Sequence, residues 1–148
     1  MQTNTRQRLK LSAGALSAVA VLAAGCGGDS YKDQVKDAAQ DFKKSVQGTS
    51  TEIRAAKTKQ QYSAGVSKFQ AAIKDFNDRV SELDPPSGAK AAQDRLISVL
   101  NTFSQDLETI KQAVNKSDIE KVRQLQAKFA VDVQQVTAAG KELEDKAD

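Results

Sequence analysis

Few side chains in this sequence could perform chemistry. The chain has no histidine and a single cysteine, Cys26. Without histidine, Ser-His and Cys-His nucleophilic sites are excluded, and the commonest general base and metal ligand is missing. With one cysteine, no disulfide can form within the chain. These absences predict a protein that is not an enzyme and has no catalytic residues.

Two groups of carboxylates are the remaining candidates, the first for a cation site and the second for acid–base chemistry. The first is a row of aspartates on one helix face, followed three residues on by lysines: Asp29, Asp33, Asp37 and Asp41 with Lys32, Lys36 and Lys44. The second group is Asp75, Asp78 and Glu82 beside Lys74 and Arg79. The lysines compete for the carboxylate oxygens, and a straight helix cannot wrap an ion that needs six or more ligands. Both groups therefore favour solvated ion pairs, and we expect no metal.

Cofactor and nucleic-acid sites have no better support. The glycines at 65, 88 and 140 lack the spacing of a phosphate-binding loop, and the di-iron sites of helical bundles require histidine. The formal charge of +3 comes from Arg6, Arg8 and Lys10, because residues 26–148 carry 19 basic and 19 acidic side chains. We therefore expect no cofactor and no nucleic-acid partner.

The first twenty-five residues have the composition of a secretion signal. Residues 1–10 are basic and contain no acid, and residues 11–24 form a run of fourteen without a charge. That run is too short to span a bilayer, which needs about 20 residues, but it suits the apolar part of a signal peptide. The segment Leu22-Ala23-Ala24-Gly25-Cys26 then puts small residues directly before the cysteine.

This segment resembles the lipobox of bacterial lipoproteins. Gly25 and Cys26 match the motif, whereas Ala23 stands where that family most often has leucine. In the family, the cysteine thiol receives diacylglycerol, and cleavage makes the cysteine the new N-terminus. The resemblance implies a signal peptide over 1–25, lipidation of Cys26, a flexible tether over 26–30, and anchoring to the extracytoplasmic face of the cell membrane. The alternative is an ordinary cleaved leader in which Cys26 is incidental.

From residue 31 onward, the apolar residues recur with helical period, and no segment alternates like a strand. Much of the spacing alternates between four and three residues, as in the seam of a helix bundle. The four stripes are Tyr31, Val35, Ala38, Phe42 and Val46, more weakly Ile53 and Ala56; Tyr62, Val66, Phe69, Ile73, Phe76, Val80 and Leu83; Leu96, Leu100, Phe103, Leu107, Ile110 and Val114; and Val122, Leu125, Phe129, Val133, Val136 and Leu143. All five phenylalanines lie on these stripes, which favours core packing over a stacking site.

The stripes predict helices near 30–57, 59–83, 88–115 and 118–145. Near-equal lengths and short connections favour an all-α fold, an antiparallel up-down-up-down four-helix bundle, in a single domain over 31–148. Residues 84–87, with two prolines, must break the chain, and Ser87 is a candidate N-cap. Residues 58–61, starting with Thr58, and 117–120, starting with Ser117, have the form of capping boxes.

An alternative ends the first helix at Gly48, a plausible C-terminal cap, and starts the next with a capping box of Thr49 and Glu52. It would give three long helices. Two patches of small residues, 63–65 and 137–140, favour close helix packing, with Gly140 as a helix end, over a groove between helices.

The Leu83-Asp84-Pro85-Pro86 segment and the helix start Ala-Lys-Ala-Ala-Gln-Asp-Arg-Leu, behind a lipobox, are similar to small helical lipoproteins of high-GC Gram-positive, actinobacterial-type bacteria. Those families are mostly uncharacterised, so the resemblance implies no activity. The sequence therefore predicts a membrane-tethered lipoprotein whose bundle is an interaction or accessory module for an unidentified envelope protein. The alternative is a carrier of a small apolar or lipid ligand between the helices. The oligomeric state stays open.

Overall fold

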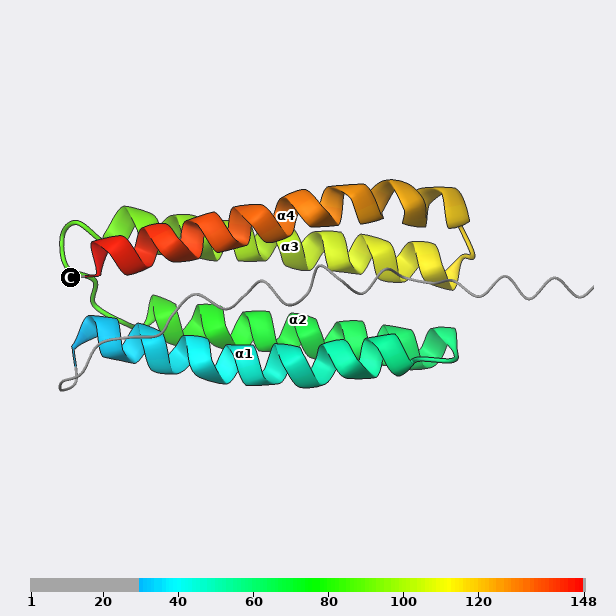
Figure 1. Ribbon diagram of the computed structural model, residues 1–148, viewed down its shortest axis with the longest axis horizontal. Coiled ribbons are helices and arrows are strands. Elements are labelled where there is room, and N and C mark those ends of the chain that lie inside the picture. Colours follow the sequence, from blue (N-terminus) through cyan, green and yellow to red (C-terminus); the bar gives the residue numbers. More distant parts are fainter. Residues whose placement is uncertain (1–29, 148) are drawn as a thin grey trace, which may run out of the picture.

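The computed structural model describes residues 30–147, which form a bundle of four helices (Figure 1). The helices are α1 (Tyr31–Ala55), α2 (Lys59–Ser81), α3 (Lys90–Asn115) and α4 (Ile119–Lys146). The predicted all-α four-helix bundle is confirmed, and every predicted helix boundary lies within two residues of the observed one. The spacing of the apolar residues therefore locates these helices to about half a turn.

Each helix runs antiparallel to the helix before it, as the polar contacts between neighbours show. For each pair of neighbouring helices, a contact that lies later along one helix lies earlier along the other. The contacts are Glu52–Lys68 and Asp41–Arg79 between α1 and α2, Val80–Gln93 and Lys59–Asn115 between α2 and α3, and Arg95–Glu142 and Asp106–Lys128 between α3 and α4. The α1–α2 and α3–α4 turns consequently lie at one end of the bundle. The start of α1, the α2–α3 connection and the end of α4 lie at the other (Figure 1).

The apolar stripes meet in one core that all four helices share. Most stripe residues are buried, and those that are only partly buried are Tyr31, Ile53, Ala56, Leu83, Val114 and Phe129. Burial of apolar surface stabilises such a core by roughly 25 cal/mol per Å². Because each stripe is covered only by the other helices, the bundle forms cooperatively.

Phenylalanine rings connect each helix to the next inside this core. The ring centroids of Phe42 in α1 and Phe76 in α2 lie 5.1 Å apart. Phe103 in α3 lies 5.8 Å from Phe69 in α2 and 4.8 Å from Phe129 in α4. At these separations aromatic pairs attract each other beyond the effect of burial alone. The interpretation of the phenylalanines as core residues is confirmed.

The capping box predicted at Thr58 is confirmed at the start of α2. The Thr58 hydroxyl accepts a hydrogen bond from the backbone N–H of Gln61 at 3.1 Å. The Gln61 side chain in turn accepts one from the backbone N–H of Lys57 at 2.8 Å. The first bond satisfies a backbone donor that the first turn of α2 leaves open, and the second holds Lys57, just before the cap, in the turn after α1.

The caps predicted for α3 and α4 are wrong. Asp118, not Ser117, caps α4, because its carboxylate accepts a hydrogen bond from the backbone N–H of Lys121 at 2.9 Å. Ser117 instead adopts a left-handed φ of 58°, which closes the α3–α4 turn. Ser87 does not cap α3 either, since that helix follows Ala89, a buried residue without a side-chain acceptor.

The three-helix alternative is also wrong, because α1 continues through Gly48 to Ala55. Thr49 is buried inside α1 rather than placed at a helix start. The chain turns at residues 56–58, where the apolar spacing loses its phase. Gly140 likewise lies within α4 and not at its end.

Gly48→Ala is expected to stabilise the bundle by about 0.5–1 kcal/mol, because alanine loses less backbone entropy than glycine on entering a helix. A Cβ at this position would have no neighbour within 4 Å. Gly65→Ala is the matched control: its Cβ would lie 2.7 Å from Ile53 Cγ1, so the same exchange should destabilise. Chemical denaturation of residues 29–148 measures both. A loss of stability at Gly48 would contradict a continuous α1.

Phe103→Ala should lower the free energy of unfolding by about 3–5 kcal/mol, because it removes two ring contacts and leaves a cavity. The Phe103 side chain is only 4% exposed. Val131, which is 50% exposed on α4, supplies the control, since Val131→Ala should change stability by less than about 0.5 kcal/mol. Equal effects of the two substitutions in a denaturant titration would show that the core is placed wrongly.

Candidate functional site

The predicted lipidation site, Cys26, lies outside the described residues, as do the signal peptide over 1–25 and most of the tether. The description begins at Ser30, whose hydroxyl accepts a hydrogen bond from the backbone N–H of Asp33 at 3.2 Å and caps α1. Tyr31, five residues after Cys26, is the first residue of α1. Little chain therefore separates any group on Cys26 from the bundle.

A hydrogen-bond network holds the start of α1 against the other helices. The Tyr31 hydroxyl donates to Gln93 Oε1 at 2.7 Å, and Gln93 Nε2 donates to the Val80 carbonyl at 2.9 Å. Burial, helped by the negative charge of Asp94, raises the pKa of Tyr31 to about 12. The phenol thus stays a hydrogen-bond donor at neutral pH, and α1, α2 and α3 are joined at the end where the chain enters.

The aspartate row is a surface feature in the part that the structure describes. Asp29 lies outside the described residues, while Asp33 accepts a hydrogen bond from the Ser30 hydroxyl at 2.8 Å. Asp41 pairs with Arg79 of α2 at 2.8 Å, and this hydrogen bond holds the pKa of Asp41 below its usual value. Across residues 30–147, no three acidic, histidine or cysteine side chains are grouped so that they could hold a metal ion.

The second carboxylate group is not brought together into one site. Asp78 pairs with Lys74 on the exposed face of α2, and this hydrogen bond raises the pKa of the lysine. Arg79 pairs with Asp41 of α1 rather than with a carboxylate of its own helix. Asp75 and Glu82 are exposed. Exposed pairs of this kind contribute at most about 1 kcal/mol each.

A depression of about 210 Å³ is lined by residues of α2 and α3. Within this lining, Asn77 Nδ2 donates to Asn101 Oδ1 at 2.9 Å, and Gln70 Nε2 donates to the Ser104 carbonyl at 3.0 Å. The Oδ1 atom of Asn77 is buried and has no hydrogen-bond partner. Because a shift of either helix would unpair both asparagines, the amide pair favours one register of α2 against α3. Besides amides, hydroxyls and isoleucines, the lining contains Lys74 and Asp78, whose ion pair keeps the lysine charged and therefore not nucleophilic.

A second polar cluster joins α3 and α4. The Lys128 ammonium donates to Asp106 of α3 and, at 3.3 Å, to Asp132 of its own helix. Asp132 is only 5% exposed, and burial raises the pKa of this carboxyl despite the lysine. One lysine therefore holds two neighbouring carboxylates, an arrangement that bridges the two helices.

The small-residue patch at 63–65 packs closely, as predicted. Gly65 lies so near Ile53 of α1 that a Cβ would clash with it, and Ser63 donates to Asn115 Oδ1 at 3.0 Å. In the patch at 137–140, Ala139 is buried while the space beside Gly140 is open. Close packing is therefore confirmed at Gly65 and Ala139 only.

Three polar side chains that the motifs do not predict as buried, Gln93, Asn77 and Asp132, are each more than nine-tenths buried. Spacing alone could have found all three. Gln93 lies three residues before Leu96, Asn77 lies four residues after Ile73, and Asp132 lies three residues after Phe129. A polar residue at a seam position is a signal for a buried hydrogen bond.

Comparisons of the chain with models of protein families, with curated proteins and with solved structures found no match. Among residues 30–147, no helix is both long enough and apolar enough to cross a membrane.

Asp132→Asn should change how stability depends on pH. Because burial raises the pKa of Asp132, the folded chain keeps a proton that the unfolded chain loses above about pH 4. The unfolding free energy of the wild type should therefore fall, relative to that of Asp132→Asn, as the pH rises from about 4 through the raised pKa. Denaturation at a series of pH values measures the difference, with exposed Asp75→Asn as control. A difference that does not vary with pH would contradict the burial effect.

Proposed function

We propose that this chain is a lipoprotein anchored through Cys26 and that its bundle is an interaction module on the outer face of the cell membrane. The observation that carries the proposal is the position of Tyr31. It starts α1 only five residues after Cys26, at the bundle end that also holds the α2–α3 connection and the end of α4 (Figure 1). A lipid on Cys26 would therefore hold the bundle by one end.

The bundle is long enough to reach well beyond the lipid headgroups. With 25 residues, α1 measures about 37 Å at 1.5 Å per residue. If the anchored bundle stands upright, the α1–α2 and α3–α4 turns are its outermost parts. Two acyl chains anchor stably where a single chain binds only weakly, so a diacylglycerol is sufficient for this arrangement.

The side chains that fill the interior of the bundle favour a role in interaction over catalysis or ligand transport. The phenylalanine contacts occupy the core between successive helices, and the buried side chains of Asn77 and Gln93 form hydrogen bonds between α2 and α3. A carrier of apolar ligands requires an apolar cavity of roughly 300 Å³ or more. The depression between α2 and α3 is smaller, and asparagine, glutamine and serine side chains line much of it. The carrier alternative thus gains no support from it.

Cys26→Ala should abolish incorporation of labelled fatty acid and block lipidation-dependent processing of the leader, because no thiol remains to accept the lipid. Ser30→Ala, which changes the tether but keeps the thiol, is the control and should leave labelling unchanged. If the Cys26→Ala protein still carries labelled lipid, the anchor proposal is wrong.

A further inference from the structure

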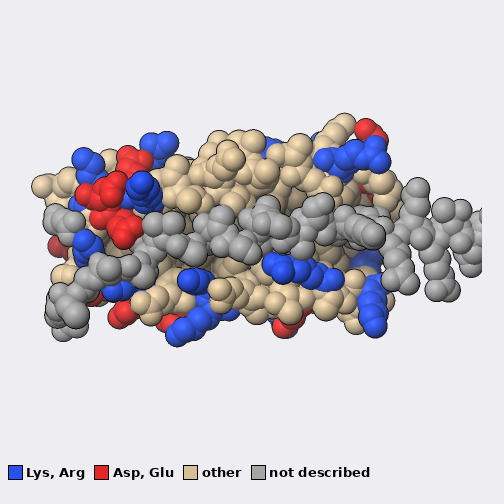
Figure 2. All heavy atoms as spheres, viewed as in Figure 1, with Lys and Arg blue, Asp and Glu red and all other residues tan. Residues whose placement is uncertain are grey.

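Charge is separated along the bundle although residues 26–148 are neutral as a whole. We call residues 52–60 and 115–123, around the α1–α2 and α3–α4 turns, the distal tip. It carries six basic and three acidic side chains. We call residues 31–37, 78–94 and 141–147 the proximal end, which carries nine acidic and six basic side chains. On the face in Figure 2, red side chains gather toward the proximal end, and the distal tip is mainly blue.

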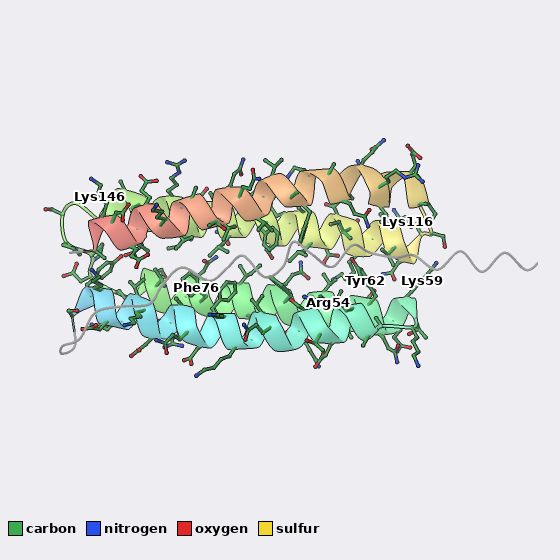
Figure 3. All side chains as sticks on the ribbon, viewed as in Figure 1. Arg54, Lys59, Tyr62, Phe76, Lys116 and Lys146 are labelled. Atoms are coloured by element: carbon green, nitrogen blue, oxygen red, sulfur yellow. The ribbon has the colours of Figure 1, made fainter. Side chains whose placement is uncertain are left out.

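The basic side chains of the distal tip come from all four helices or their ends. They are Arg54, Lys57, Lys59, Lys116, Lys121 and Arg123, and every one of them is exposed. Figure 3 shows Arg54, Lys59 and Lys116 at this end of the bundle and Lys146 at the other. The antiparallel pairing of the helices thus assembles a basic surface from two segments that are about sixty residues apart in the sequence.

The acidic residues of the tip do not neutralise this surface. Glu52 pairs with Lys68, outside the tip, at 2.7 Å, and Glu120 pairs with Arg123 at 3.6 Å. Asp118 is engaged in capping α4. Within residues 30–147, the cations that have no carboxylate partner at the tip are Arg54, Lys57, Lys59, Lys116 and Lys121. The Lys59 ammonium instead donates to the Asn115 carbonyl at 2.9 Å, which ties the two turns together.

Helix dipoles explain only part of this arrangement. Cations stabilise the C-terminal ends of helices, so Arg54 in the last turn of α1 and Lys116 after α3 are favourable there. Lys57 directly follows the C-cap of α1, and the Lys59 ammonium binds the last carbonyl of α3, so these two lysines also lie near helix C-termini. Lys121 lies in the first turn of α4, where a positive charge is unfavourable, and a requirement for positive charge at the tip accounts for it.

We propose that the distal tip binds a linear polyanion, a polymer with repeating phosphate or carboxylate groups, outside the membrane. The proposal rests on the anchor at Cys26, which would make the tip the outermost part of the molecule. Lysines dominate the tip, and an ammonium is a point charge rather than a two-pronged donor, so charge density and not the shape of one group is recognised. A second copy is a poor partner, because its acidic proximal end would be held at the membrane by its own anchor.

The test compares two triple variants of the full chain, purified in a neutral detergent. Lys57→Glu, Lys116→Glu and Lys121→Glu reverse three charges at the tip. Lys90→Glu, Lys141→Glu and Lys146→Glu make the same change in total charge at the proximal end. Circular dichroism checks that both are folded, and a milder tip variant with glutamine at the same three positions removes the charges without reversing them.

Binding is measured with inorganic polyphosphate of defined length and, separately, with polygalacturonate. We expect the wild type to bind, with an affinity that falls as salt rises, and the tip variant to lose at least roughly tenfold. The glutamine variant should lose less, and the proximal variant should stay within roughly threefold of the wild type. Binding of one polymer only would support the proposal and name the anionic group, phosphate or carboxylate.

The proposal is overturned if the wild type binds neither polymer near physiological salt, as it would if the true partner were an acidic protein surface. It is also overturned if the two triple variants lose affinity equally. The measurement in detergent does not depend on the membrane anchor. If the chain purified from its native membrane carried no lipid on Cys26, the anchor would be contradicted, whereas polyanion binding by that same chain would leave the assignment of the tip intact.

Discussion

The whole structure depends on covering four apolar stripes at the same time. A helix cannot shield its own apolar stripe from water, so each stripe is buried only against the other helices. Pairs of phenylalanine rings link α1 to α2, α2 to α3 and α3 to α4 in the core. Because every helix completes the burial of its neighbours, the helices, their short turns and the polar contacts between them form together. The antiparallel order that brings these stripes together also decides which turns share an end, and so which charges meet there.

Apolar spacing determines most of what is predictable from this sequence, because a seam that alternates steps of four and three residues has few competing structures. Helix ends are less predictable. At Ser117 the left-handed backbone angle decides the turn, and at Ser87 the burial of the next alanine does, and neither is visible in local sequence. The buried polar groups are predictable in position but not in partner: Gln93, Asn77 and Asp132 each lie three or four residues from a stripe residue, whereas the bond of Asn77 to Asn101 exists only once α3 packs beside α2.

The basic tip could not be predicted from composition, because it exists only after folding. The leader supplies the excess positive charge of the full chain, and the rest is neutral. The two turns that form the tip are far apart in sequence and become neighbours through the packing of α2 on α3. A lysine near a helix end is unremarkable singly, but Lys57, Lys59 and Lys121 share one surface. The membrane anchor would give that surface its direction.

The height of the tip above the membrane tests most directly whether the bundle stands on its anchor. A fluorophore at Lys57→Cys in the tip, or at Ser87→Cys in the α2–α3 connection, reports this height through energy transfer to dyes in the headgroups of vesicles that carry the lipidated chain. We predict that the label at 57 lies about 35 Å farther from the bilayer than the label at 87, the length of one helix. Equal heights for the two labels would contradict an end-on anchor and a tip that faces outward.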